Sequence, residues 1–235
     1  MKKPIIGIIG RPNTIMSGYS VMSVNESLRE AIVRAGGNPI MILPTQNVDY
    51  ETSQPRLMDR LTNDEKEDII NQIKLCDGVV LPGGFKWYEY DLFIASYLVD
   101  NDIPTLGLCM GMQLLAYVDN IGKEVVNNNL HKIESSIDHF QKGVVHVHDV
   151  DIVPNTMLNE IFKTDKLPVN SRHNYAVSEL NNAIVSAYST DKEIEAIEFP
   201  NKKFIVGIQW HPESILENRP ENQKIFNKLV EESQK

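Results

Sequence analysis

The sequence has little cysteine and no long apolar run. Its two cysteines, Cys76 and Cys109, cannot form a disulfide framework, and we expect two reduced thiols in a cytoplasmic protein. No apolar stretch approaches the roughly 20 residues of a membrane-spanning helix. The apolar run at residues 5–9 is also shorter than the roughly seven residues that a signal peptide needs. These absences argue against a disulfide-rich scaffold, a secreted protein and a membrane protein.

Basic residues are also scarce. The chain has 23 Lys and Arg against 32 Asp and Glu, and its formal net charge is −9. Because the basic residues form no cluster, the sequence has no electrostatic footprint for a nucleic-acid partner. No internal repeat, low-complexity tract or linker divides the 235 residues, a length that suffices for one well-packed domain. We therefore predict a single domain over residues 1–235.

Apolar runs of strand length alternate with helical patterns in the first half of the chain. We expect strands at residues 4–9, 39–43, 78–81 and 105–108, and helices at residues 23–35, 62–75, 92–99 and 110–117. Ser23 with Glu26, and Thr62 with Glu65, have the spacing of a capping box. Continuous apolar strands between helices indicate a parallel sheet that is covered on both faces.

The second half of the chain has a different pattern. Strand-like runs follow one another through short connections, at residues 144–153, 183–188, 195–199 and 204–209, before a final helix at residues 221–232. Short connections are typical of antiparallel pairing. The sequence thus predicts an α/β fold: a three-layer sandwich with a mostly parallel central sheet and added antiparallel strands.

Cys109 lies where an expected strand meets an expected helix, in the sequence TLGLCMGMQ at residues 105–113. Gly107 and Gly111 stand two residues before and two residues after it, as in a nucleophile elbow. The chain must reverse within one residue there, so these neighbours have no room for a Cβ. The helix N-terminus also favours the thiolate, which is the attacking form. A buried structural cysteine is the alternative.

A second motif, GIQWHPE, places a histidine, a proline and a carboxylate after the strand at residues 204–209. His211 and Glu213 are two residues apart, so on an extended segment their side chains face the same way. Glu213 could then accept a hydrogen bond from one ring nitrogen, and the other nitrogen could take the proton of a thiol. A surface histidine beside a surface glutamate is the alternative.

The third motif is Pro82-Gly83-Gly84, at the end of the strand at residues 78–81. Its backbone N–H groups, together with that of Met110, could form an oxyanion hole, although a simple turn is the commoner use of this motif. All three motifs fall at the ends of expected strands, which is the usual place for a site in an open α/β sheet.

Several other residues have two interpretations. His146 and His148 could face one metal ion, but no carboxylate or cysteine cluster accompanies them, so we expect strand residues and no metal site. Arg11 could contact a substrate carboxylate, although a solvated loop residue is the simpler interpretation. We expect Cys76 to be a small buried hydrophobe. Three aromatic residues could equally line a pocket or pack in the core: Trp87, Tyr88 and Tyr90.

Taken together, the motifs resemble those of class I glutamine amidotransferases, over residues 4–230. The elbow of that family, G-x-C-x-G-x-Q, is matched at residues 107–113, its G-x-Q-W/F-H-P-E segment at residues 207–213, and its Pro-Gly-Gly strand end at residues 82–84. Two stretches are similar to the γ-glutamyl hydrolase branch, which includes γ-glutamyl-γ-aminobutyrate hydrolases: an H-x-V strand at His146, and a V-N-S-x-H segment that ends in His173.

This resemblance implies a flavodoxin-like fold and a cysteine hydrolase of γ-glutamyl amide bonds that needs no cofactor and no metal. Cys109 would attack the amide carbon, His211 would transfer the proton, and Glu213 would orient His211. The N–H groups of Gly84 and Met110 would form the oxyanion hole. The residues implied to bind the small-molecule γ-glutamyl substrate are Gly83, Gln113 and His173.

The sequence departs from the hydrolase branch at three places: residues 85–91 replace an Asp-rich stretch, Asn174 replaces a second histidine, and residues 123–130 replace a G-G-x-L-x-Q signature. These places are where the leaving amine would be selected. Two other functions stay open: a glutaminase that delivers ammonia to a synthase partner, and a catalytically silent binding protein, against which the intact triad argues. The oligomeric state is also open, a homodimer included.

Overall fold

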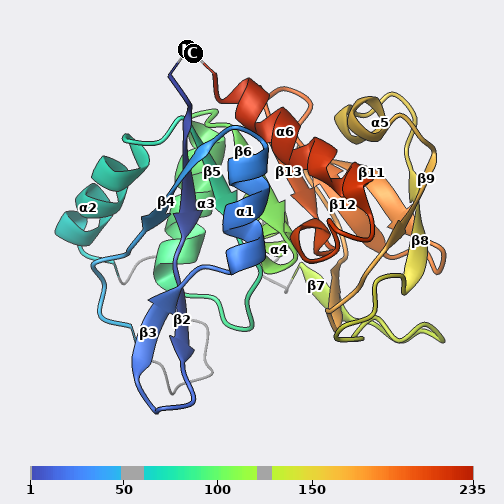
Figure 1. The fold of residues 1–235 in the computed structure, drawn as a ribbon, viewed down its shortest axis with the longest axis horizontal. Helices are drawn as coiled ribbons and strands as arrows, with labels where there is room; N and C mark the ends of the chain where they lie inside the picture. Colours follow the sequence, from blue (N-terminus) through green and yellow to red (C-terminus); the bar gives the residue numbers. More distant parts are fainter. Residues whose placement is uncertain (1, 49–60, 121–128, 235) are drawn as a thin grey trace.

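The computed structural model describes residues 2–48, 61–120 and 129–234, and within them a central sheet with helices on both faces (Figure 1). The helices are α1 (Glu26–Arg34), α2 (Asn63–Ile73), α3 (Glu89–Asp100), α4 (Met110–Asp119), α5 (Met157–Phe162) and α6 (Gln223–Glu232), with short 3-10 turns η2 (Pro212–Ser214) and η3 (Pro220–Asn222). None of the described helices combines the length and the apolar character that crossing a bilayer demands.

The described strands fall into a large mixed sheet and one hairpin. They are β1 (Ile5–Ile9), β2 (Arg11–Thr14), β3 (Ser20–Ser23), β4 (Asn38–Ile42), β5 (Gly78–Leu81), β6 (Thr105–Leu108), β7 (Leu130–Lys132), β8 (His148–Ile152), β9 (Lys166–Val169), β10 (Tyr175–Val177), β11 (Ile184–Ser189), β12 (Ile194–Glu198) and β13 (Ile205–Ile208). The sheet order is β4-β1-β5-β6-β13-β12-β11-β8-β9, and β10 joins β12 and β7. The β2–β3 hairpin projects beyond the carboxyl end of β1 (Figure 1).

The sheet is parallel in one half and antiparallel in the other. Parallel pairs join β4, β1, β5, β6 and β13, and antiparallel pairs join β12, β11, β8 and β9. β6 and β13 are direct neighbours, with Gly107 opposite Gly207. Because these two strands run in the same direction, the segments that follow them leave the sheet at the same edge. This pairing brings Cys109 and His211 together.

Two hydrophobic cores lie on the two faces of the sheet. On one face, side chains from α1, α5 and α6 pack against the sheet, including Leu28, Ile32 and Phe226. On the other face the contacts come from α2, α3 and α4. Burial of each such side chain contributes about 1.5–3 kcal/mol. The predicted three-layer sandwich, with its mostly parallel central sheet and added antiparallel strands, is confirmed. The interpretation of residues 1–235 as one domain stays a prediction.

One of the two predicted capping boxes is present. Thr62 Oγ1 accepts a hydrogen bond from the Glu65 amide (3.2 Å), and the Glu65 carboxylate accepts one from the Thr62 amide (2.8 Å). The other was wrong. Helix α1 begins at Glu26 with Asn25 as its N-cap residue, and Ser23 instead pairs with Arg11 in the β2–β3 hairpin. This hairpin was not predicted, because Arg11–Thr14 contains a proline and no apolar alternation.

Short elements in the second half were also missed. The expected strand at residues 144–153 is shortened to β8, and α5, β7, β9 and β10 were not predicted. Strands of three or four residues are too short to show a clear alternation. Residues 45–61 are polar and predict a loop, but they lie largely outside the described residues. So does most of the departure at residues 123–130.

Candidate active site

Cys109 stands alone between β6 and α4, with φ 51° and ψ −106°. A positive φ is rare for a residue with a side chain, and it marks the strained tip of an elbow. The adjacent glycines are sterically required. A Cβ on Gly111 would lie 2.0 Å from the carbonyl oxygen of Leu81, and one on Gly107 would lie 2.7 Å from the backbone of Gly111. The close approaches that the sequence predicted around Cys109 are therefore present.

His211 follows β13 and is held by the carboxylate two residues further on. Its Nδ1 donates a hydrogen bond to Glu213 Oε1 at 2.8 Å, and Glu213 itself is buried in the turn η2. That bond fixes the proton on Nδ1 and leaves Nε2 for the thiol. The side chains of His211 and Cys109 lie close enough for each to shift the pKa of the other. The predicted nucleophile, base and orienting carboxylate thus lie side by side.

The electrostatics of this chain favour an ion pair between Cys109 and His211. Burial acts to raise the pKa of Cys109, but the charge of the nearby His211 and the N–H of Met110 outweigh it and lower that pKa. Burial acts to lower the pKa of His211, but Glu213 and Cys109 outweigh it and raise that pKa to about 10. Both shifts favour the thiolate and the imidazolium, the reactive state.

Cys76 has the opposite environment. It is buried, and this burial, with the nearby Asp77, raises its pKa to about 11. Its Sγ donates to the carbonyl oxygen of Gln72 at 3.5 Å. The interpretation of Cys76 as a small buried hydrophobe is confirmed.

Gly83 and Gly84 follow β5 and lie against the catalytic residues. A Cβ on Gly83 would lie 2.8 Å from His211 Cε1, and a Cβ on Gly84 would lie 3.0 Å from Met110 Cε. A side chain on Gly83 would therefore collide with His211, and one on Gly84 would press against the end of the Met110 side chain. This placement suits an oxyanion hole built from the amides of Gly84 and Met110, a role that stays a prediction.

Cys109, His211 and Glu213 open onto a cavity of about 920 Å³. Its walls come from β2, the start of α1, the loop after β5 and the segment around Phe140. The lining carries four cationic side chains, namely Arg11, Lys86, Lys142 and Arg172. A site for a negatively charged small molecule is consistent with such a wall, in a chain whose overall charge is negative.

The sequence of residues 86–213, more than half of the chain, matches the Peptidase C26 family. The chain belongs to this class I glutamine amidotransferase-like family. A glutamine amidotransferase-like protein of Rickettsia prowazekii is 28% identical, over 99% of this chain and 98% of its own length. The CTP synthase of Borreliella afzelii is 29% identical over 87% of this chain. The match covers 41% of that CTP synthase, so the chain spans about two fifths of its length.

Solved structures share the fold of this chain. A GMP synthase subunit from Thermoplasma acidophilum superimposes with a TM-score of 0.64 at 16% identity, covering 99% of this chain and 95% of its own. The glutaminase domain of Trypanosoma brucei CTPS, with bound acivicin, gives a TM-score of 0.62 at 18% identity, covering 97% and 94%. Family and relatives support a glutamine amidotransferase-type hydrolase.

Asn170 is a site residue of this Peptidase C26 protein whose role was not predicted. It is fully buried, and its side chain brackets the backbone of His211: Oδ1 accepts from the His211 amide (2.9 Å), and Nδ2 donates to the His211 carbonyl oxygen (3.0 Å). Nδ2 also lies 2.9 Å from Ser214 Oγ. The V-N-S-x-H segment contained this residue, but only its histidine was assigned a role.

Arg11 corrects another expectation, since it is not a solvated loop residue. Its side chain is 13% exposed, donates to Asp91 Oδ1 at 2.6 Å and to the Pro82 carbonyl oxygen at 3.2 Å, and lines the cavity. Burial raises the pKa of Asp91, and Arg11 opposes that rise. The signal in the sequence was Asp91, a carboxylate at the apolar start of α3. A carboxylate that is buried there needs a cation beside it.

The three residues predicted to bind the substrate do not all lie at the cavity. Gly83 lines the cavity, whereas Gln113 and His173 are absent from the described lining. Gln113 Nε2 donates to the carbonyl oxygen of Tyr175 (3.0 Å) and to Gln209 Oε1 (3.2 Å). His173 Nε2 lies 3.3 Å from Glu195 Oε1. The substrate-binding roles of these residues stay predictions.

The aromatic residues divide between the two interpretations. Tyr88 lines the cavity, while Tyr90 is fully buried beneath it with the two rings stacked at 5.3 Å. Trp87 packs edge-on against Tyr117. Thus one of the three forms a wall and the other two are packing residues.

His146 and His148 do not face the same carboxylate. His146 lies outside β8, is exposed and contacts Asp149, whereas His148 is buried beside Glu195. The expectation that no carboxylate accompanies this pair was wrong for His148, because Glu195 is distant in sequence and reaches it through the sheet.

Proposed function

We propose that this protein is a cysteine hydrolase that acts without a partner on γ-glutamyl amides and releases glutamate and an amine. The observation that carries the proposal is the contact chain Cys109–His211–Glu213, which opens onto a cavity with cationic walls. Because the nucleophile must be a free thiol, we place the reaction in the reducing cytoplasm. The same free thiolate argues against a catalytically silent binding protein.

The reaction follows from the positions of the groups. The Cys109 thiolate attacks the amide carbon, and the amides of Gly84 and Met110 stabilise the resulting oxyanion. The His211 imidazolium, oriented by Glu213, gives its proton to the leaving amine, and the C–N bond breaks to leave a thioester. Neutral His211 then takes a proton from water, the hydroxide attacks the thioester, and glutamate leaves as the thiolate re-forms.

The cavity indicates an acidic leaving group. Its volume of about 920 Å³ exceeds what a glutamine side chain needs, and it falls in the range of sites for larger small molecules. Arg172 lines it, and its buried Nε has no hydrogen-bond partner among the described residues. Arginine favours carboxylates. We infer a substrate with a carboxylate on each side of the scissile amide, such as γ-glutamyl-γ-aminobutyrate.

A second function has specific support. The chain matches CTP synthases over two fifths of their length, so it could act as the glutaminase of a separate synthase. Large apolar side chains are exposed beside the cavity: Phe85 (88%), in its lining, and Tyr19 (71%), in the connection between β2 and β3. A synthase that docks there would cover them.

Turnover of matched substrates separates the two functions. The purified chain is incubated with glutamine, γ-glutamyl-γ-aminobutyrate and γ-glutamyl-butylamine, which differs from the second by lacking the carboxylate of the amine. Glutamate release is measured, with Cys109→Ala as the control. We expect turnover of γ-glutamyl-γ-aminobutyrate to exceed the others. Activity on glutamine that requires an added synthase would favour the second function, and absence of any turnover or Cys109 labelling would contradict both.

A further inference from the structure

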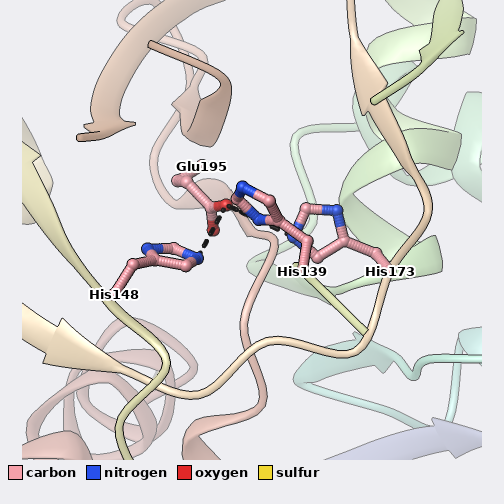
Figure 2. Close-up of side chains that lie close together, drawn as sticks. All are labelled: His139, His148, His173 and Glu195. Atoms are coloured by element: carbon pink, nitrogen blue, oxygen red, sulfur yellow. Dashed lines mark ion pairs between the residues drawn. The ribbon is translucent and has the colours of Figure 1, made fainter. Parts of the chain in front are cut away.

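A second polar cluster lies close to the candidate active site but outside the cavity lining. It consists of His139, His148, His173 and Glu195, named here the His–Glu cluster (Figure 2). Its members come from four separate segments of the chain, and their side chains are at most 2% exposed. One ring nitrogen of each histidine and one carboxylate oxygen all lie within 4.8 Å of one another.

The atoms at the centre of the His–Glu cluster lack ordinary partners. Glu195 Oε1 lies 3.6 Å from His139 Nδ1, 3.5 Å from His148 Nε2 and 3.3 Å from His173 Nε2. Neither oxygen of Glu195, nor Nε2 of His148 or His173, has a hydrogen bond within the described residues. A buried carboxylate without a partner is strongly unfavourable. The centre of the cluster therefore requires a positive charge.

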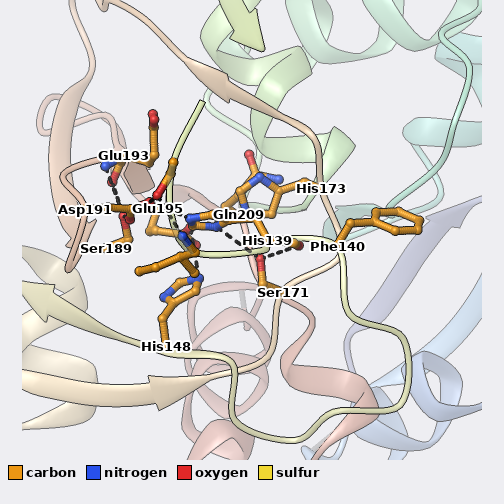
Figure 3. A network of polar contacts seen from close by, with 12 residues as sticks. His139, Phe140, His148, Ser171, His173, Ser189, Asp191, Glu193, Glu195 and Gln209 are labelled. Atoms are coloured by element: carbon orange, nitrogen blue, oxygen red, sulfur yellow. Dashed lines mark hydrogen bonds and ion pairs between the residues drawn. The ribbon is translucent and has the colours of Figure 1, made fainter. Parts of the chain in front are cut away.

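The outer nitrogen of His139 is held by a carboxylate (Figure 3). His139 Nε2 lies 2.9 Å from Asp191 Oδ2, and Asp191 also accepts hydrogen bonds from Ser135 and Ser189. The proton of His139 is therefore on Nε2, and Nδ1 presents its lone pair to the cluster. Ser171 Oγ approaches Nδ1 at 3.3 Å, but it donates its own hydrogen to the His139 carbonyl oxygen at 2.7 Å.

The outer nitrogens of the other two rings are held by backbone carbonyl oxygens. His148 Nδ1 lies 3.2 Å from the oxygen of Asp149, and His173 Nδ1 lies 3.1 Å from that of Tyr175. A carbonyl oxygen only accepts, so both protons are on Nδ1 and both Nε2 lone pairs face Glu195. This outer arrangement is the one that orients metal-binding histidines. One extra proton would satisfy one of these contacts, whereas a cation satisfies all of them.

The spacing also fits a metal ion. Four ligands at the bond lengths of zinc, about 2.0–2.2 Å, are about 3.3–3.6 Å apart at the corners of a tetrahedron. The distances from Glu195 Oε1 to the three rings are 3.3–3.6 Å. We propose that His139, His148, His173 and Glu195 bind a divalent transition metal, Zn²⁺ by preference for three imidazoles and a carboxylate.

This site is structural, because the protein supplies all four ligands and leaves no position for a substrate. The metal joins β12 and β8 to the two loops that carry His139 and His173. His173 is three residues after Asn170, which brackets the backbone of His211. The metal therefore fixes the segment that positions the catalytic histidine. The proposal is independent of the proposed function, since it concerns metal content and stability.

The first test measures metal in full-length protein without an affinity tag. We expect about one zinc per chain by plasma mass spectrometry, removal by a chelator with a fall in Tm, and recovery when Zn²⁺ is added. His148→Ala and Glu195→Gln should lose the metal. His146→Ala, the matched control on an exposed ring, should retain it, and Asp191→Asn should bind about 10–100-fold more weakly.

Two further arms keep the test decisive. Cys109→Ser should retain zinc, because the thiolate is not a ligand. Wild-type protein loaded with Co²⁺ should have the intense visible bands of a tetrahedral ion, a measurement that needs no variant to fold. The proposal is overturned if the metal-free wild type binds no added Zn²⁺, if folded His148→Ala keeps one equivalent, if Cys109→Ser loses it, or if bound Co²⁺ is octahedral.

Discussion

Two histidine–carboxylate arrangements lie close together in this protein, and their distances assign them different tasks. In the proposed catalytic arrangement, Glu213 accepts a hydrogen bond from one ring nitrogen of His211 at 2.8 Å, and the other nitrogen is left for a thiol at the cavity. In the His–Glu cluster one carboxylate faces three ring nitrogens at 3.3–3.6 Å. The first geometry has a proton between the groups, and the second has room for a cation. In the His–Glu cluster an oxygen atom holds the outer nitrogen of each ring, so the inner nitrogen presents its lone pair to the centre.

The largest expected effect separates the two arrangements directly. His211→Ala should lower kcat by at least about 10⁴-fold, because the base that takes and returns the proton is lost. The same variant should keep its zinc, since His211 is no part of the His–Glu cluster. Steady-state kinetics and metal analysis on one preparation check both statements. Retention of a tenth of the wild-type kcat would remove His211 from the mechanism.

The two cysteines provide the next test of the catalytic arrangement. The pKa of Cys76 is raised to about 11, so about one molecule in 10⁴ is thiolate there at pH 7, whereas the pKa of Cys109 is lowered. Iodoacetamide should therefore label Cys109 at least about 10²-fold faster, as measured by peptide mass spectrometry. Labelling of Cys109 should fall as the pH drops through its lowered pKa. Equal rates at the two thiols would contradict the ion pair with His211.

The same substitution in both carboxylates sharpens the comparison further. Glu213→Gln should lower kcat by about 10²-fold or more, because the amide no longer stabilises the imidazolium, while zinc content stays unchanged. Glu195→Gln should lose zinc and lower Tm, with a smaller effect on kcat. Circular dichroism confirms that each variant is folded. If Glu195→Gln lost activity but kept its metal, Glu195 would act in catalysis and would not be a metal ligand.

The catalytic arrangement could be predicted because its signals are local. Cys109 with its flanking glycines, and His211 two residues from Glu213, are each contained in a short segment. The His–Glu cluster could not be predicted, since its four residues come from distant segments that only the antiparallel part of the sheet brings together. Local spacing drew attention to His146 and His148, and only His148 belongs to the cluster.

The fold shows the same division. Each buried apolar strand of the parallel half was predicted close to its observed position. The β2–β3 hairpin was not, although it supplies Arg11 to the cavity, because the order of its residues carries no strand periodicity. The partner of Arg11, Asp91, lies on α3, and no pattern within either segment pairs them.

The smallest expected effect is at Asn170, which connects the two arrangements. Asn170→Ala removes both hydrogen bonds to the backbone of His211, so the base shifts from its productive position. We expect kcat to fall by about 10-fold with KM nearly unchanged, since a small displacement of a catalytic group reduces the rate of the chemical step. Steady-state kinetics with the substrate that turns over best measures both parameters.

A matched control separates positioning from stability. Asn129 is a buried asparagine that donates to the Ala116 carbonyl oxygen away from the site, so Asn129→Ala should lower Tm and leave kcat unchanged. Asn170→Asp keeps the oxygen that accepts from the His211 amide and should recover part of the lost kcat. If Asn129→Ala lowered kcat as much as Asn170→Ala, the effect would be one of general stability. The bracket around His211 would then have no separate role in catalysis.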